Sequence, residues 1–305
     1  MLLEYYKTKL GIKEMPDFLK KYLELPIIER LKYITYLCGM DYASKDVYDF
    51  KEEITRYDHS LTTALMTWNL TQDKEATIAA LFHDAATPCF SHVIDFMNGD
   101  HVKQESTEKL HGKILRGSKG LKDMLESDGI DIGDIINFKQ YSVVDLERPK
   151  LCADRLDGII LTGISWAAKV DKNMIDAVVR DITVYENEDK EKEIGFVDEI
   201  TALDVLIVNQ SIDYLCHTRF DYYMMNLLAD IVKLGIEKGY YSYVDLYKMN
   251  EIVLLDILNN ANDGEILSLL NKFYNIKESE IPLFKVSNNK VKSRVLKPFV
   301  SGERM

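Results

Sequence analysis

The chain has 305 residues, of which 47% are hydrophobic, and its formal net charge is −12. This length suffices for one large domain or two small ones with a buried core. The acidic balance argues against a surface that coats nucleic acid, because contacts with the phosphate backbone need clustered lysine and arginine. No stretch reaches the ~18 apolar residues that a membrane-spanning helix needs.

The cysteines are far apart in the sequence and show no CxxC spacing; they are Cys38, Cys89, Cys152 and Cys216. This pattern favours free buried thiols over a disulfide framework or a zinc knuckle. The segment Met1–Lys7 lacks the basic region followed by an apolar one that marks a secretion signal. We therefore expect a reducing, cytoplasmic environment.

Taken in chain order, apolar residues recur at intervals of three and four along most of the sequence, as is typical of core-facing helices. The pattern predicts helices over 15–40, 60–72, 74–86, 104–116, 150–169 and 203–238, and shorter helices near 243–274. The fold class expected from this pattern is all-α, a helical bundle.

Two places break the helical pattern. Ile182–Tyr185 and Ile194–Val197 flank a polar run and predict a β-hairpin with a solvated turn. Nearer the C-terminus, Leu283–Val286 and Val291–Val295 predict a second small hairpin around Ser287–Asn289.

The sequence contains no internal repeat, low-complexity tract or Pro/Gly/Ser-rich linker. We therefore predict a helical core over 1–245, with a small C-terminal helical and hairpin appendage over 246–305 packed on that core. Aromatic-rich stretches such as Tyr214–Tyr223 and Tyr240–Tyr241 favour core or oligomer contacts over base stacking. These stretches are compatible with a homo-oligomer.

The most informative local feature is the dipeptide His83–Asp84, which follows the apolar helical run 74–82 and precedes Pro88. Its position predicts that Asp84 lies near the partially negative C-terminal end of a helix, where an unpaired carboxylate is disfavoured. A bound cation would reverse that cost by ligating the carboxylate and the imidazole.

Further ionisable residues accompany this dipeptide. Four of the six histidines, His59, His83, His92 and His101, fall within 43 residues, and Asp154 lies in a later apolar helix where a charge needs a partner. Two imidazoles and two carboxylates form a ligand set that suits Mn, Fe, Mg, Ni or Zn and leaves positions open for water and substrate.

The order His59, His83–Asp84, Asp154 resembles the signature of the HD-domain metal-dependent phosphohydrolases, a helical superfamily. The surrounding sequence is most similar to its deoxynucleoside triphosphate triphosphohydrolase branch. The similarity covers, patchily, about 25–285, and its motifs lie at 55–61, 83–84, 88–95, 101–106 and 217–219.

The resemblance implies an HD-domain helical bundle in which His59, His83, Asp84 and Asp154 hold one divalent metal ion. It implies that His92, Asp95 and His101 form the catalytic group. Phosphoester hydrolysis needs a metal-activated water and a proton donor, for which we expect His101, with Asp95 stabilising its imidazolium form.

The resemblance also assigns cationic positions to Arg56, Arg155 and Arg219, each of which could hold phosphate oxygens with forked donors. Taken singly, an arginine is more often a surface or structural ion-pair residue. We therefore rank Arg56 and Arg219 above Arg155.

The sequence departs from the branch's pattern around the substrate. Thr87 replaces a second histidine four residues after the first, and Tyr36 replaces a sugar-contacting glutamine. Gly158 replaces a tyrosine that closes the sugar pocket, and Thr162 replaces an acid. The basic cluster after the His–Thr–Arg stretch is absent. These changes predict weak discrimination at the sugar.

The function expected from these residues is a metal-dependent phosphohydrolase acting on a small nucleotide, similar to the dNTP triphosphohydrolases. The alternatives are a phosphomonoesterase or a cyclic-nucleotide phosphodiesterase on the same centre, and a non-catalytic nucleotide sensor. A purely structural helical protein fits least, because burying so many ionisable groups without a ligand is costly.

Overall fold

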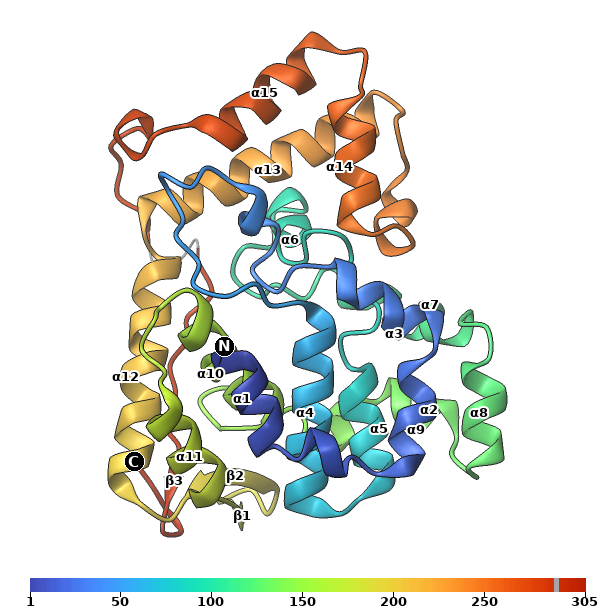
Figure 1. The fold of residues 1–305 in the computed structure, drawn as a ribbon, viewed down its shortest axis with the longest axis vertical. Helices are drawn as coiled ribbons and strands as arrows, with labels where there is room; N and C mark the ends of the chain where they lie inside the picture. The colour runs from blue at the N-terminus through green and yellow to red at the C-terminus, as the bar shows by residue number, and fades with distance from the viewer. Residues whose placement is uncertain (288–290) are drawn as a thin grey trace.

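The computed structural model describes residues 1–287 and 291–305. Over these residues the chain forms fifteen α-helices and one four-stranded sheet, which confirms the expected all-α bundle with small β additions (Figure 1). The helices of the first half are α1 (Leu2–Lys9), α2 (Asp17–Leu23), α3 (Pro26–Glu29), α4 (Arg56–Thr71), α5 (Lys74–Phe82), α6 (Val93–Met97), α7 (His111–Arg116), α8 (Leu121–Ser127) and α9 (Ile132–Ile136). Those of the second half are α10 (Ala153–Ser165), α11 (Lys172–Asp181), α12 (Glu199–Cys216), α13 (Arg219–Glu237), α14 (Glu251–Asn259) and α15 (Gly264–Asn275).

Helix α4 is the central element. Thr55 and Asp58 form a capping box at its start, in which each side chain accepts a hydrogen bond from the backbone N–H of the other residue. Most of its residues are buried on all sides, as is expected of a helix enclosed by others. It packs against both α5 and α10, and α10 packs in turn on α12. The candidate site lies at the ends of α4, α5 and α10.

The second half of the molecule continues from this core. Helix α12 ends at Cys216 and α13 begins at Arg219, so the single run predicted over 203–238 is wrong. Thr218 causes the break, because its side chain caps α13 by accepting from the N–H of Asp221. Helix α13 packs against α6 and α15, and α14 and α15 lie at the end of the molecule opposite the sheet (Figure 1).

The predicted helix over 15–40 is also interrupted. Helix α2 ends before Pro26, which opens the short helix α3. After a 3-10 turn the backbone becomes extended at Ile34, and Thr35 pairs with Thr55 in an isolated antiparallel bridge. Proline and β-branched residues disfavour a continuous helix. The bridge carries Tyr36 to the start of α4.

The helix predicted over 60–72 begins earlier than expected, because α4 starts at Arg56. The helices predicted over 74–86, 104–116 and 150–169 are shorter than their apolar patterns, because turns and 3-10 segments take their ends. Within the range 104–116, for example, α7 begins only at His111.

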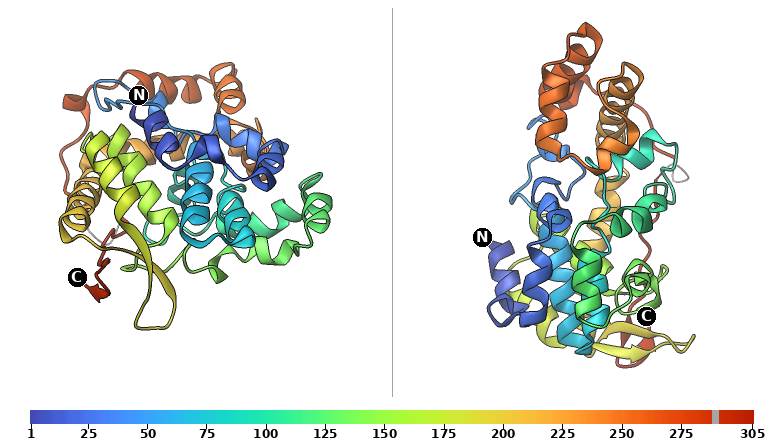
Figure 2. Two further views of the ribbon diagram at one scale, coloured as in Figure 1. Left: turned by 60° about the horizontal axis from the view of Figure 1, so that its bottom comes forward. Right: turned by 90° about the vertical axis from the view of Figure 1, so that its right-hand side faces the viewer.

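The sheet has the order β1–β2–β3–β4, formed by β1 (Ile182–Glu186), β2 (Lys192–Phe196), β3 (Phe299–Val300) and β4 (Glu303–Arg304). The first predicted hairpin is confirmed, since β1 and β2 pair antiparallel and project from the helical body (Figure 2). The turn of the second predicted hairpin was placed at Ser287–Asn289, of which 288 and 289 lie outside the described residues. Its flanks, 283–286 and 291–295, form no strand; β3 instead adds parallel to β2.

The C-terminal helices contact the core through buried side chains. Arg30 donates hydrogen bonds to the carbonyl oxygens of Met249, Ala85 and Thr87. Glu251 is fully buried at the start of α14 and accepts from the backbone N–H groups of Thr35 and Phe90, at 3.0 and 2.8 Å. The region after residue 245 is thus hydrogen-bonded to the segments on both sides of α4 and α5. The division at residue 245 itself stays a prediction.

Candidate metal centre

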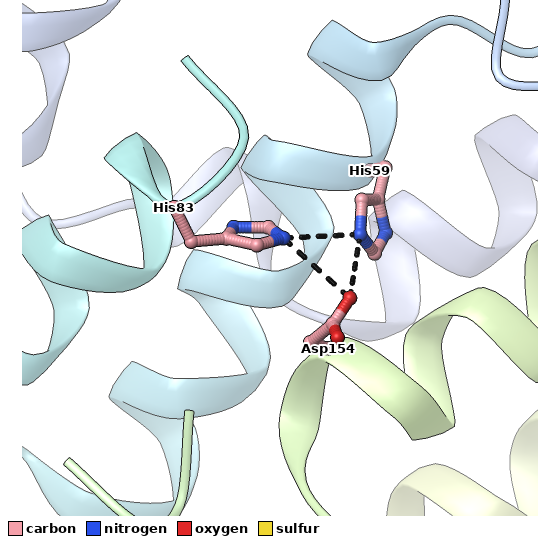
Figure 3. Close-up of side chains that lie close together, drawn as sticks. All are labelled: His59, His83 and Asp154. Atoms are coloured by element: carbon pink, nitrogen blue, oxygen red, sulfur yellow. Dashed lines mark hydrogen bonds and ion pairs between the residues drawn. The ribbon is translucent and has the colours of Figure 1, made fainter. Parts of the chain in front are cut away.

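Three side chains from three helices converge on one point. His59 lies in the first turn of α4, His83 directly follows the last residue of α5, and Asp154 is the second residue of α10 (Figure 3). His59 Nε2 lies 3.2 Å from His83 Nε2 and 3.0 Å from Asp154 Oδ1, and His83 Nε2 lies 3.5 Å from the same oxygen. Two imidazole nitrogens and a carboxylate oxygen at this spacing form a candidate site for a metal ion.

Hydrogen bonds at Nδ1 orient the rings of the two histidines. His83 Nδ1 donates to the carbonyl oxygen of Ala80 at 2.7 Å, and a carbonyl can only accept. His59 Nδ1 donates to Asp157 Oδ2 at 2.8 Å. Each ring therefore has its Nδ1 hydrogen-bonded away from the shared point and turns Nε2 toward it, which is how proteins orient metal-binding histidines.

Asp157 was not among the residues singled out from the sequence. It is fully buried one helical turn after Asp154 and also accepts hydrogen bonds from Tyr6 and Thr62, at 2.8 and 2.9 Å. An aspartate three positions after a ligand on an apolar helix is the signal that could have identified it. Its role is to hold His59.

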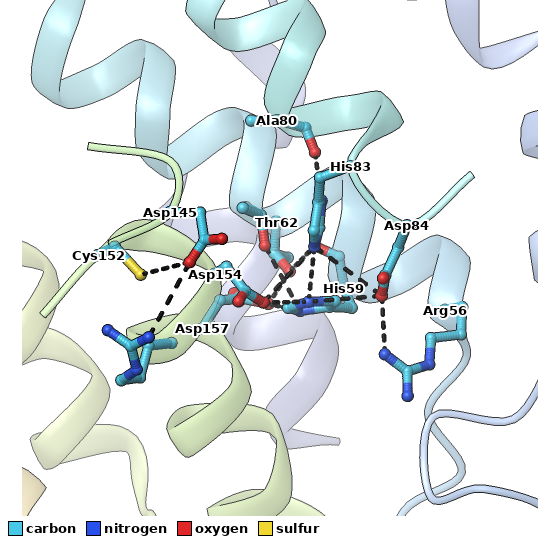
Figure 4. A network of polar contacts seen from close by, with 12 residues as sticks. Arg56, His59, Thr62, Ala80, His83, Asp84, Asp145, Cys152, Asp154 and Asp157 are labelled. Atoms are coloured by element: carbon cyan, nitrogen blue, oxygen red, sulfur yellow. Dashed lines mark hydrogen bonds and ion pairs between the residues drawn. The ribbon is translucent and has the colours of Figure 1, made fainter. Parts of the chain in front are cut away.

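The fourth expected ligand, Asp84, lies beside this point but is paired with an arginine. Its Oδ2 accepts from Arg56 at 2.7 Å and lies 3.9 Å from the Nε2 atoms of both His59 and His83 (Figure 4). Burial opposes its ionisation, but the guanidinium of Arg56 holds the pKa of Asp84 well below its usual range. An ionised carboxylate is thus available next to the candidate site.

Arg56 is the one predicted cationic residue that lines the site. It is 6% exposed, donates through Nε to Ser91 Oγ at 3.2 Å, and its guanidinium lies 4.8 Å from the ring centre of Tyr36. Arg155 instead donates to the carbonyl oxygens of Leu146 and Lys150.

Arg219 is likewise bound elsewhere. It donates to the carbonyl oxygen of Ile281 and packs over the ring of Phe220. Neither Arg155 nor Arg219 lines the cavity described below. Both guanidinium groups are held elsewhere by backbone carbonyl oxygens.

His92 and Asp95 form a pair at the start of α6. His92 Nδ1 and Asp95 Oδ2 are 3.0 Å apart, and the fully buried Asp95 also accepts from Ser106 Oγ at 2.6 Å. Phe90 and Ser91, which precede His92, both have positive φ angles, 62° and 48°. Residues with side chains rarely adopt this conformation. The bond from Phe90 N–H to Glu251 helps to hold it.

His101 is not brought to this group. Its ring lies 4.5 Å from the ring of Phe96 and 6.1 Å from that of Tyr222. It does not line the cavity beside the candidate ligands. Its assignment as proton donor stays a prediction without a contact that supports it.

A cavity of about 70 Å³ opens beside the convergent side chains. It is lined by Arg56, His83, Asp84, Ala86, Thr87, Ser91, His92, Gln104, Thr107, Glu108 and His111. Gln104 and His111 were missed from the sequence. Gln104 lies in an irregular stretch, at a positive φ of 57°, that no periodic pattern reveals. His111 is the next histidine after the cluster at 59–101, and that proximity was the available signal.

Two residues that depart from the resembled pattern face each other. A Cβ atom at Gly158 would lie 2.7 Å from the hydroxyl oxygen of Tyr36. The ring of Tyr36 lies 4.9 Å from that of His59, so the tyrosine stands directly beside a candidate ligand. Thr162 is buried one turn further along α10.

A second convergence shares Asp154, whose carboxylate lies near Asp145 and Cys152. The Cys152 thiol donates to Asp145 Oδ1 at 3.9 Å, and burial raises the pKa of that thiol to about 12. A protonated thiol is a poor metal ligand. The His59, His83 and Asp154 group is therefore the better metal site.

No protein-family model matches the sequence. The chain is similar to the uncharacterized protein YdhJ of Bacillus subtilis, at 24% identity over 268 residues that cover 87% of this chain and 78% of YdhJ. It is also similar to the metal-dependent phosphohydrolase cns2 of Cordyceps militaris, at 26% identity over 113 residues. That match spans 37% of this chain and 32% of cns2, about a third of each protein. Among the described residues, no helix combines the length and the apolar character that crossing a bilayer requires.

Proposed function

We propose that this protein is a metal-dependent phosphohydrolase of the HD type. The observation that carries the proposal is the convergence of His59 Nε2, His83 Nε2 and Asp154 Oδ1, with each imidazole ring held by a hydrogen bond at Nδ1 so that Nε2 faces the shared point. The partial similarity to a protein named as a metal-dependent phosphohydrolase supports the same reading.

The residues present fit one divalent ion. His59, His83 and Asp154 would hold it, and the ionised Asp84 would complete the set, with the metal one of Mn, Fe, Mg, Ni or Zn. When bound, such an ion supplies a Lewis acid for a phosphoryl oxygen and a water of lowered pKa. Arg56 orients Asp84 and places a permanent positive charge in the cavity wall.

Proton transfer in this proposal falls to His92. Its ring lines the cavity, and Asp95 holds it through the 3.0 Å contact with Nδ1, so that Nε2 is directed away from that carboxylate. Burial lowers the pKa of His92, and the hydrogen bond with Asp95 opposes part of that fall.

The substrate we propose is a small nucleotide, in keeping with the resemblance to the dNTP triphosphohydrolases. Tyr36, Gly158 and Thr162 replace the groups with which that branch reads the sugar, so ribo- and deoxyribonucleotides should be hydrolysed at similar rates. A site without such partners gains or loses little when a hydroxyl is added.

One observation favours the alternative of a phosphomonoesterase or cyclic-nucleotide phosphodiesterase. Of the described residues that line the cavity, Arg56 alone is a lysine or arginine, whereas a triphosphate carries several negative charges. A single cationic side chain suits one phosphate group better than a triphosphate.

A substrate screen decides between these functions. Purified protein would be incubated with dNTPs, NTPs, nucleoside monophosphates and cyclic nucleotides, each with Mn²⁺, Fe²⁺, Mg²⁺, Ni²⁺ or Zn²⁺, and triphosphate and orthophosphate release would be scored separately. Asp154→Ala is the matched control, since it removes a proposed ligand. Turnover that persists in Asp154→Ala would show that this centre is not the catalytic site. Nucleotide binding without any turnover would favour the non-catalytic nucleotide sensor.

A further inference from the structure

His111 is a histidine for which the metal centre gives no role. It is the first residue of α7, is only 8% exposed, and lines the cavity together with His83 and Asp84. Among the described residues, no group forms a hydrogen bond with its Nε2, which is buried. Native proteins satisfy nearly all buried polar atoms, so an exception in a cavity wall calls for a ligand, a water or an ion.

The ring is held in place by packing. Phe138 contacts His111 edge-on, with 5.4 Å between ring centres, and contacts His83 in the same way at 6.0 Å. One phenyl ring therefore spaces His111 from the candidate ligand. Among the described residues, His111 is not in a group whose ligand atoms lie close enough together to hold a metal ion, so the metal centre leaves it unassigned.

The surroundings keep this ring neutral. Burial and the nearby His83 lower the pKa of His111 to about 4. A neutral imidazole can still donate one N–H, and Gln104, which is 7% exposed in the same wall, offers an uncharged amide. Neutral donors can bind anionic oxygens without the desolvation cost of a buried cation.

We propose that His111 Nε2–H binds a phosphate oxygen of the substrate in the cavity that Arg56 and His92 also line. This contact would make His111 a further substrate-binding residue of the phosphohydrolase. The inference therefore rests on the proposed function. The ligand it recognises is a tetrahedral phosphate group, whether free or esterified.

The test uses two replacements of His111 in the full-length, Mn²⁺-loaded protein. His111→Phe keeps an aromatic ring against Phe138 and removes both nitrogens, and His111→Gln keeps an N–H donor. His217→Gln is the control, because His217 lies at the end of α12 outside the cavity and its Nδ1 donates to the carbonyl oxygen of Asp213. The readouts are bound metal per chain, melting temperature, calorimetric affinity for inorganic phosphate, and kcat/KM for the best nucleotide of the screen.

We expect His111→Phe to retain its metal and to melt at or above the wild-type temperature, because an unpaired buried nitrogen is removed. Its phosphate affinity and kcat/KM should fall roughly 10- to 100-fold, as for loss of a hydrogen bond to a charged group. His111→Gln should recover part of the loss, and His217→Gln should match the wild type. A structural histidine would give the opposite signature, with a lower melting temperature and unchanged phosphate affinity.

Wild-type phosphate affinity in His111→Phe would overturn the inference, as would a loss of bound metal, which would make His111 a ligand. The two proposals fail separately. If no nucleotide is hydrolysed but phosphate binding still depends on His111, the nucleotide function fails and this inference holds. If the wild type hydrolyses nucleotides and His111→Phe equals it, this inference alone fails.

Discussion

The hydroxyl of Tyr36 occupies the space that a side chain at residue 158 would need, since a Cβ there would lie 2.7 Å from the hydroxyl oxygen. The two positions are far apart in the sequence, yet their residues are compatible only as a pair. The Tyr36 ring also contacts His59 in a tilted arrangement and lies against the guanidinium of Arg56, so displacing it would disturb both. The two departures from the resembled nucleotide site are thus one structural change.

Gly158→Ala should therefore lower kcat/KM by pushing the Tyr36 ring against His59. The same change in a Tyr36→Phe background, which lacks the clashing oxygen, should cost less. We expect a coupling free energy of about 0.5–3 kcal/mol, typical of residues in contact. A double-mutant cycle on kcat/KM and on melting temperature measures it, and strictly additive effects would show that the pair is independent.

Asp157→Asn should weaken metal binding although Asp157 is not a proposed ligand. The amide can present its NH₂ group to His59 Nδ1, which disfavours the tautomer with a free Nε2, and such changes usually cost roughly 10- to 100-fold in affinity. Calorimetric titration with Mn²⁺ would measure the loss. Tyr6→Phe, which removes another hydrogen bond to the same carboxylate, is the control and should bind the metal nearly as the wild type does.

Replacing His92 and His101 separately distinguishes the geometry from the resemblance. His92→Ala should lose roughly 10²–10⁴-fold in kcat with its metal retained, the contribution of a positioned proton-transfer group. His101→Ala should lose less than about 10-fold, because its ring packs on Phe96 away from the cavity. Metal analysis must accompany the kinetics, and the reverse order of the two losses would restore His101 as the acid.

Glu251→Gln should change how stability depends on pH. Burial raises the pKa of Glu251 to about 7, although the N–H groups of Thr35 and Phe90 oppose the rise. The ordinary pKa of a glutamate side chain is 4.5, so the folded state binds the proton more tightly than the unfolded state does. Its contribution to stability is complete below about pH 4.5 and is lost as the pH rises to about 7.

The melting temperature of the wild type should consequently fall more steeply between pH 4.5 and 7 than that of Glu251→Gln. Because one amide proton would face a backbone N–H, the variant should also position His92 less well and lose activity. Parallel melting curves for the two proteins over this range would contradict the assignment of the titration to Glu251.

The sequence allowed the helical fold and the residues of the metal centre to be predicted to different degrees. His59, His83 and Asp154 come from helix ends, and helices are encoded by local periodicity that can be read directly. The helix predicted over 15–40 failed at Pro26 and at the extended Ile34, where a bridge to Thr55 overrides the apolar pattern.

The cavity wall was harder to predict. Gln104 and His111 reach the cavity wall because of the course of residues 98–110, which form no α-helix or strand. No periodic pattern in the sequence encodes that course. Arg155 and Arg219 matched cationic positions, but backbone carbonyl oxygens accept their hydrogen bonds, and such tertiary acceptors cannot be seen in a linear pattern. Asp157 resembled any helical aspartate until its partners were known.

The contact between Glu251 and Phe90 has a consequence for the order of events during synthesis. The two residues are 161 positions apart, so the chain that carries every proposed metal ligand is made well before the carboxylate that fixes the turn ahead of His92. A nascent chain that ends before α14 could gather the ligands yet would lack this restraint. We expect metal capture to precede catalytic competence as the protein leaves the ribosome.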